Sequence, residues 1–128
     1  MKKLLISVLA ACAFATGSAL ASTPYFKSNA TSTAALVSAV PAKLAAYNIS
    51  NPNGAVVYVQ FFDAAATSSV TPGSTAPYFV LAVPAYGVTD GVTSQPPVFV
   101  SGIVIVVATT ATGSGAPSSA CPVTLLVQ

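Results

Sequence analysis

Short apolar runs alternate with turn-forming segments through most of this chain. The runs are rich in valine, isoleucine and aromatic residues and occupy residues 55–63, 78–83, 98–100, 103–107 and 123–127. Such residues favour extended strands, and no run is long enough to cross a bilayer as a helix. Together with weaker signals at 36–40, at 43–50 and around Val88, they predict about seven or eight short strands. For residues 33–40, a helix ended by Pro41 is the alternative.

Two of the runs carry apolar side chains on both faces. Residues 55–63 and 103–107 therefore predict central strands that are covered on both sides. Because such a sheet needs another layer, the sequence predicts an all-β fold, a small antiparallel β-sandwich of the jelly-roll or immunoglobulin-like type. Asn53-Gly54 predicts a tight hairpin between residues 43–50 and 55–63, and Pro72-Gly73 predicts a type II turn.

The first 21 residues contain the three parts of a secretory signal in order. Lys2 and Lys3 precede an apolar run over residues 4–15, and Ala19-Leu20-Ala21 is a small-x-small cleavage site. The run predicts a short signal helix, about half as long as a membrane span. We therefore expect a cleavable signal peptide (1–21), an extended N-terminal arm with one short strand (22–42) and a β-sandwich domain (43–128).

Export is the predicted destination, as an extracellular, cell-surface or periplasmic protein with no membrane attachment after cleavage. An alternative comes from Leu9-Ala10-Ala11-Cys12, which resembles the lipobox of bacterial lipoproteins and would place a lipid anchor at Cys12. The short apolar run before Cys12 and the apolar residues after it favour the cleavable signal.

The expected mature chain carries four charged side chains, Lys27, Lys43, Asp63 and Asp90, so its net charge is zero. They are spread over about 5,400 Å² of surface, as expected for a folded monomer of this size. Proteins near zero net charge tend to associate. We therefore expect contacts with copies of the same chain or with a larger protein assembly. Two lysines cannot form the basic stripe that a nucleic acid requires.

The chain contains no histidine, glutamate, arginine or tryptophan. A serine nucleophile would therefore lack its usual base, and one thiol without imidazole is a poor zinc site. Asp63 and Asp90 both stand in turn-forming contexts and are interpreted as turn residues instead of a catalytic pair. The sequence predicts a protein that is not an enzyme, with no catalytic, cofactor-binding or metal-binding residues.

Cys121 is the only cysteine left after cleavage, so it forms either a bridge between two chains or a buried, inert thiol. Its neighbours Ala120 and Pro122 carry no charge that would activate it, which favours the inert thiol. Five tyrosines are candidates for a sugar-binding face or for cross-strand packing, which is the more frequent role. They are Tyr25, Tyr47, Tyr58, Tyr78 and Tyr86.

An ordered series of short stretches over residues 45–113 resembles small virion structural proteins of tailed and environmental phages. The series is Ala46-Tyr-Asn-Ile-Ser-Asn51, Val57-Tyr-Val-Gln-Phe-Phe-Asp-Ala64, Gly73-Ser-Thr-Ala-Pro77, Val83-Pro-Ala85, Ser101-Gly-Ile103 and Ala108-Thr-Thr-Ala-Thr-Gly113. The resemblance implies a small β-sandwich that serves as a non-catalytic building block of a particle, and it supplies no functional residues.

The secretory signal departs from that family, whose members assemble in the cytoplasm, so an exported bacterial protein with the same fold is an alternative. One such protein is a pilus or matrix subunit in which residues 22–40 lend a strand to the next copy. Another is a secreted module that binds a ligand or a glycan.

Overall fold

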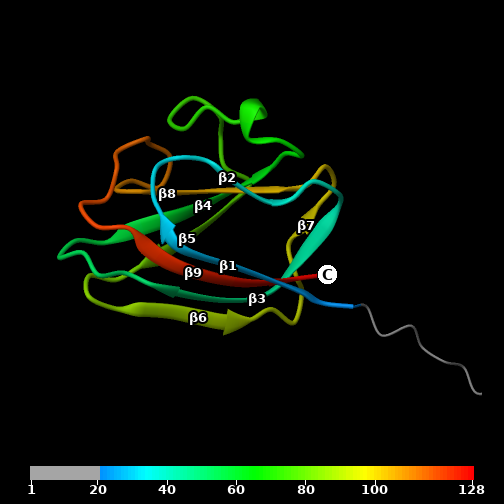
Figure 1. The fold of residues 1–128 in the computed structure, drawn as a ribbon, viewed down its shortest axis with the longest axis horizontal. Helices are drawn as coiled ribbons and strands as arrows, with labels where there is room; N and C mark the ends of the chain where they lie inside the picture. Colours follow the sequence, from blue (N-terminus) through cyan, green and yellow to red (C-terminus); the bar gives the residue numbers. More distant parts are fainter. Residues whose placement is uncertain (1–20) are drawn as a thin grey trace, which may run out of the picture.

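The structure, a computed structural model, describes residues 21–128 (Figure 1). The predicted signal helix and the alternative lipid anchor at Cys12 lie outside the described residues. The described part is all-β, as predicted, and its only helical element is the single 3-10 turn Thr67–Ser69. Its nine strands are β1 (Thr23–Ala30), β2 (Ala35–Ser38), β3 (Ala42–Ser50), β4 (Val57–Asp63), β5 (Phe79–Val83), β6 (Val88–Val92), β7 (Val98–Phe99), β8 (Ile103–Ala108) and β9 (Cys121–Val127).

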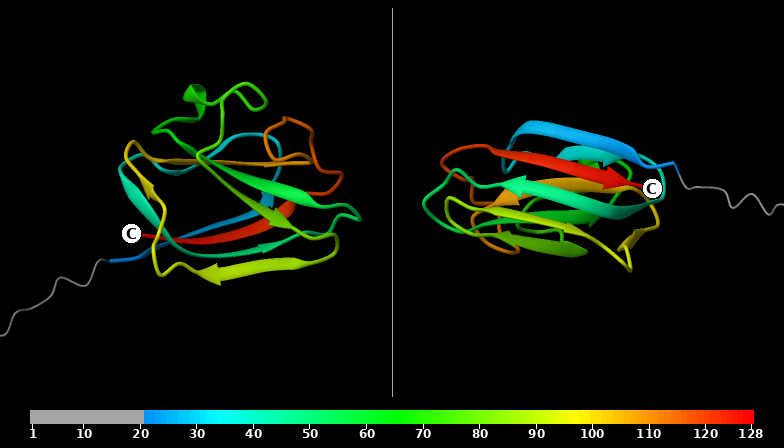
Figure 2. Two further views of the ribbon diagram at one scale, coloured as in Figure 1. Left: turned by 180° about the vertical axis from the view of Figure 1, so that it is seen from behind. Right: turned by 90° about the horizontal axis from the view of Figure 1, so that it is seen from below.

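The strands form two antiparallel sheets in a sandwich-like arrangement (Figures 1 and 2). The first sheet has the order β1-β9-β3-β6, with β7 also paired to the start of β3, and the second has the order β2-β8-β4-β5. The pairs are nested along the chain. The innermost pair is β4 with β5, followed outward by β3 with β6, β2 with β8 and finally β1 with β9.

The main core lies between the two sheets. Its largest fully buried side chains come from β3, β4, β7, β8 and β9, and include Leu44, Ile49, Phe61, Phe99, Ile103, Ile105 and Leu125. The Phe61 ring packs at a tilt against Phe79 and Phe99, with centroids 5.6 and 6.4 Å apart. Full burial of a side chain of this size stabilises the fold by about 1.5–3 kcal/mol.

The second sheet is also covered on its outer face. All six residues of β8 are buried, which confirms the prediction that β4 and β8 are central strands with two apolar faces. A second buried cluster lies on this side and consists of Phe62, Ala64, Val70, Val104, Val106 and Ala108. The loop between β4 and β5 contributes Val70. The buried Gln60 side chain holds the loop between β8 and β9 by donating to the carbonyl oxygens of Thr110 (3.0 Å) and Gly113 (2.9 Å).

The N-terminal segment differs from its prediction. The sequence predicts an extended arm with one short strand over residues 22–42, whereas the structure places both β1 and β2 there. β1 pairs with β9 in the first sheet and β2 with β8 in the second, so the segment is part of both sheets and residues 33–40 are not helical. The partners of both strands are distant in sequence, which no local pattern reveals.

The predicted hairpin at Asn53-Gly54 is wrong. β3 and β4 belong to different sheets, so residues 51–56 cross from one sheet to the other. A type I′ turn needs positive φ at both central residues, but within residues 21–128 only Tyr86 and Gly73 have positive φ. The Pro72-Gly73 turn is confirmed, because Gly73 has φ +84° and the Ser74 N–H donates to the Thr71 carbonyl oxygen at 3.0 Å.

The described residues include no helix of sufficient length and apolarity to cross a membrane.

Candidate functional site

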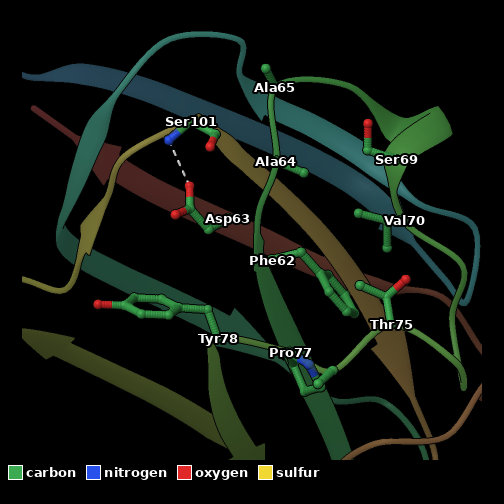
Figure 3. Close-up of a pocket in the computed structure, with 11 residues that line it drawn as sticks. Phe62, Asp63, Ala64, Ala65, Ser69, Val70, Thr75, Pro77, Tyr78 and Ser101 are labelled. Carbon is green, nitrogen blue, oxygen red and sulfur yellow. Dashed lines mark hydrogen bonds between the residues drawn. The ribbon is translucent and has the colours of Figure 1, made fainter.

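A cavity of about 650 Å³ lies under the loop that joins β4 to β5 (Figure 3). Its polar lining consists of the Asp63 carboxylate, the Tyr78 phenol and the hydroxyl groups of Ser69, Thr75 and Ser101. Its apolar wall includes Phe62, Val70 and Pro77. Asp63 and Tyr78 lie on one side of β4 in Figure 3, with Phe62 and Val70 on the other.

Asp63, at the end of β4, has its carboxylate engaged with the backbone. Its Oδ1 accepts hydrogen bonds from the backbone N–H groups of Ser101 (2.7 Å) and Gly102 (3.4 Å). The Ser101 N–H is the main cause of a pKa below the ordinary value of 3.8, so Asp63 is a carboxylate at neutral pH. The side chain therefore fixes the turn between β7 and β8, which supports its interpretation as a turn residue.

This cavity can hold a small polar molecule by hydrogen bonds, but it contains a single carboxylate. Besides that carboxylate, the lining supplies a phenol and hydroxyl groups. In the part of the chain that the structure describes, no three His, Cys, Asp or Glu side chains come together. The cavity therefore offers hydrogen-bonding contacts that can position a small polar molecule.

Asp90 is not a turn residue, contrary to its interpretation from the sequence. It lies within β6, opposite Asn48 of β3, and its side chain is exposed. Its neighbour Gly91 is a strand residue opposite Tyr47, whose hydroxyl would be 2.8 Å from a Cβ at that position. The close approach of Tyr47 explains the glycine without a turn. Asp90 does not line the cavity that contains Asp63.

Cys121 is fully buried at the start of β9. Burial raises the pKa of its thiol, and the Asn53 side-chain amide, 3.6 Å from Sγ, only partly offsets that effect. The predicted buried, inert thiol is therefore consistent with its surroundings. A bridge to a second chain would need this strand to leave the core.

The five tyrosines do not form one aromatic face. Tyr25 and Tyr47 pack against the main core, whereas Tyr58 is on β4 of the second sheet. Tyr78 and Tyr86, which are 57 % and 79 % exposed, stand before and after β5 and so at its opposite ends. Tyr78 also makes an edge contact with Phe99, with ring centroids 5.1 Å apart.

A buried amide network at Asn51 and Asn53 was not predicted from the sequence. The Asn51 Nδ2 lies within hydrogen-bonding distance of the carbonyl oxygens of Ala55 (2.8 Å), Pro84 (3.0 Å) and Val83 (3.1 Å), and Oδ1 accepts from the N–H and Nδ2 of Asn53. The two side chains are only 1 % and 5 % exposed. Asparagine next to proline and glycine is typical of a solvated turn, so the sequence gives no sign of this burial.

Asn53 connects the same loop to the segment before β9. Its Oδ1 accepts from the Ser119 N–H (2.6 Å) and the Ser118 hydroxyl (2.8 Å), and its Nδ2 donates to the Ser119 carbonyl oxygen at 2.9 Å. Two further backbone bonds join residues 51–53 to the loop between β5 and β6, from Asn51 N–H to Gly87 O and from Tyr86 N–H to Asn53 O. Three loops at one end of the sandwich are therefore fixed together.

Comparisons with known proteins found no match among protein-family models, curated proteins or solved structures.

Proposed function

We propose that this protein is an exported, non-enzymatic structural protein that acts through contacts with copies of itself or with a larger protein assembly. The observation that carries the proposal is the character of its surface. Residues 21–128 contain four charged side chains, while ten large apolar side chains are at least 41 % exposed. The ten are Phe26, Leu36, Val40, Val56, Tyr78, Tyr86, Val88, Val92, Val98 and Val100. Two of them, Val98 and Val100, line one apolar groove, and exposed apolar patches of this kind mark interaction sites.

The fold type that best fits this role is a jelly roll. The nested strand pairs support it, because they are the pairs of one long hairpin that has been rolled into two sheets, with β7 as an additional strand of the first sheet. Jelly rolls are frequent in viral capsid and lectin domains. The resemblance of residues 45–113 to small phage virion proteins supports the same role, a building block of a particle.

Size-exclusion chromatography with light scattering on the purified product of the full chain tests the proposal. We expect oligomers whose fraction increases with concentration and changes little with salt, because apolar contacts are not screened as ion pairs are. A strictly monomeric protein at the highest attainable concentration would contradict self-association and leave only contact with a different protein. Intact-mass measurement on the same sample distinguishes cleavage after Ala21 from lipidation at Cys12.

A subunit that exchanges a strand with its neighbour is a second candidate, and the position of β1 favours it. β1 is an N-terminal edge strand that pairs only with β9, and Ala30 is its only buried residue. Apart from the packing of Tyr25, little core contact is therefore lost when β1 leaves its own sheet for the same place in a second copy.

A cross-strand disulfide distinguishes exchange from simple contact. Phe26 and Thr124 are directly opposite on the exposed face, so the pair Phe26→Cys and Thr124→Cys has strand-pair geometry suitable for a bond. If β1 is exchanged, oxidised oligomers run as linked chains on a denaturing gel without reductant. Linkage within single chains would exclude exchange, and the two single variants are the controls.

A further inference from the structure

One end of the sandwich has an apolar, uncharged surface, which we call the Tyr86 tip. It consists of the exposed residues 52, 54–56 and 84–86, in the loops that join β3 to β4 and β5 to β6. Their sequences, Pro52, Gly54-Ala-Val56 and Pro84-Ala-Tyr86, contain no charge. Val56 is 41 % exposed and Tyr86 is 79 % exposed. The tip is therefore a projecting apolar surface on loops that are hydrogen-bonded to one another.

Tyr86 occupies a backbone position that suits glycine. The Gly87 N–H donates to the Pro84 carbonyl oxygen at 3.1 Å, so Tyr86 is the third residue of a tight turn, and its φ is +50°. Type II turns need positive φ at that place and usually have glycine there, because a side chain with positive φ costs roughly 1–2 kcal/mol. A bulky residue that destabilises its own turn points to a role outside the fold.

The Tyr86 ring also lies against the neighbouring loop. Its hydroxyl and Cζ are so near Gly54 that a Cβ there would lie 2.9 and 3.3 Å from them. The glycine therefore lets the ring lie close against the backbone of the neighbouring loop. An exposed aromatic side chain that is already ordered loses little conformational entropy when it binds, which is the property of residues that dominate interfaces.

The opposite end of the sandwich has an apolar groove of about 380 Å³. Pro41, Lys43, Val98, Val100 and Gln128 line it, and the buried Phe99 forms part of its floor. Val98 and Val100 are 46 % and 70 % exposed. β3 runs from one end to the other: its first residue pairs with β7 beside the groove, and its last pairs with Val88, two residues after Tyr86. The ends are thus roughly 27 Å apart along β3. Figure 2 shows β7 and the loop between β5 and β6 at opposite ends of the sandwich.

We infer that the Tyr86 tip of one copy docks into this groove of the next copy, in a head-to-tail contact. The inference rests on the proposed function. A projecting apolar surface and an apolar groove at opposite ends of one molecule cannot meet within a copy, but they can join successive copies into rings or filaments. Lys43, which lines the groove, supplies electrostatic complementarity to the Tyr86 ring, because an ammonium group is attracted to the face of a tyrosine ring.

Two variants and their mixture test the inference by analytical ultracentrifugation of the full-chain product. Tyr86→Gly removes the projecting side chain, and Val100→Asp places a charge in the groove. Each should raise the dissociation constant at least about 30-fold, as loss of a central interface residue does. Tyr86→Gly should also unfold at the same or a higher temperature than the wild type, because it relieves the turn. Leu36→Asp, at an exposed apolar residue outside both surfaces, is the control and should assemble as the wild type does.

The mixture identifies head-to-tail contact. Tyr86→Gly retains an intact groove and Val100→Asp retains an intact tip, so together they should form one-to-one heterodimers that grow no further. Unchanged assembly of Tyr86→Gly, or a mixture that stays monomeric, would overturn the inference and leave the proposed function standing. A monomeric wild type would overturn the inference together with the proposed self-association.

Discussion

Replacement of Asn51 by alanine should destabilise the fold by about 3 kcal/mol, although the side chain lies in a loop. The change removes the acceptor of two buried donors, the N–H and one Nδ2 hydrogen of Asn53. It also removes the amide that bonds to the carbonyl oxygens of Ala55, Val83 and Pro84. Each buried donor left unpaired costs about 1–3 kcal/mol, and the lost bonds to the carbonyl oxygens add to this. For a domain of this size, the melting temperature should fall by about 15 °C.

Thermal and denaturant unfolding, followed by far-ultraviolet circular dichroism, measure this loss. Asn48→Ala, at an exposed position of β3, is the matched control and should change the stability by less than about 0.5 kcal/mol. Asn51→Asp separates hydrogen bonding from shape, because it retains the shape but places a buried carboxylate against carbonyl oxygens. That setting raises the pKa of the new carboxyl group, so this variant should become more stable as the pH falls. A loss below about 1 kcal/mol for Asn51→Ala would refute the role of the network.

Three further results are expected. Hydrogen bonds to Asp63 lower the pKa of its carboxyl group in the folded state. The stabilisation by this carboxylate is therefore complete above the unfolded pKa, near 3.8, and is lost as the pH falls through the lower folded pKa. Asp63→Asn should abolish that part of the acid dependence of the melting temperature. The buried thiol of Cys121 should react with a thiol reagent at least about 100-fold more slowly in the native protein than in denaturant; equal rates would show that β9 opens readily. Val106 is buried under the loops and Val107 between the sheets, so replacement of either by alanine should lower the free energy of unfolding by roughly 1–3 kcal/mol. A negligible loss for Val106→Ala in urea unfolding would mean that the loops do not bury the outer face.

The positions of most strands could be predicted because they depend on local composition. The run over residues 103–107 became β8, and the run over 43–50 became β3, each within one residue at either end. β-branched and aromatic side chains favour an extended backbone, whichever strand is the pairing partner. Burial of β8 on both faces followed from its unbroken apolar sequence. The segments that cover its outer face could not be predicted, because these loops are rich in small and polar residues.

The pairing partners and the loop contacts could not be predicted in the same way. Asn53-Gly54 has the residues of a hairpin, but the fold uses the asparagine side chain to bond Ser119, which is distant in sequence. Asp90-Gly91 looks like a turn, yet the glycine makes room for the Tyr47 ring within a sheet. Tyr86 gave no signal at all, because an Ala-Tyr-Gly turn reveals its positive φ only in the folded chain. These features depend on neighbours that nested, long-range pairing brings together.

At the Tyr86 tip, polar side chains are buried and apolar side chains are exposed, which is the reverse of the usual arrangement in surface loops. Asn51 and Asn53 are buried beneath the loops, while Val56 and Tyr86 face solvent. Ordinary connecting loops expose their polar residues and move. Here the buried amides satisfy the backbone from inside, so the exposed surface is free to be apolar and is still fixed. A fixed apolar surface loses little entropy on contact. The two asparagines therefore stabilise the fold and also hold the backbone at Tyr86 in place before binding.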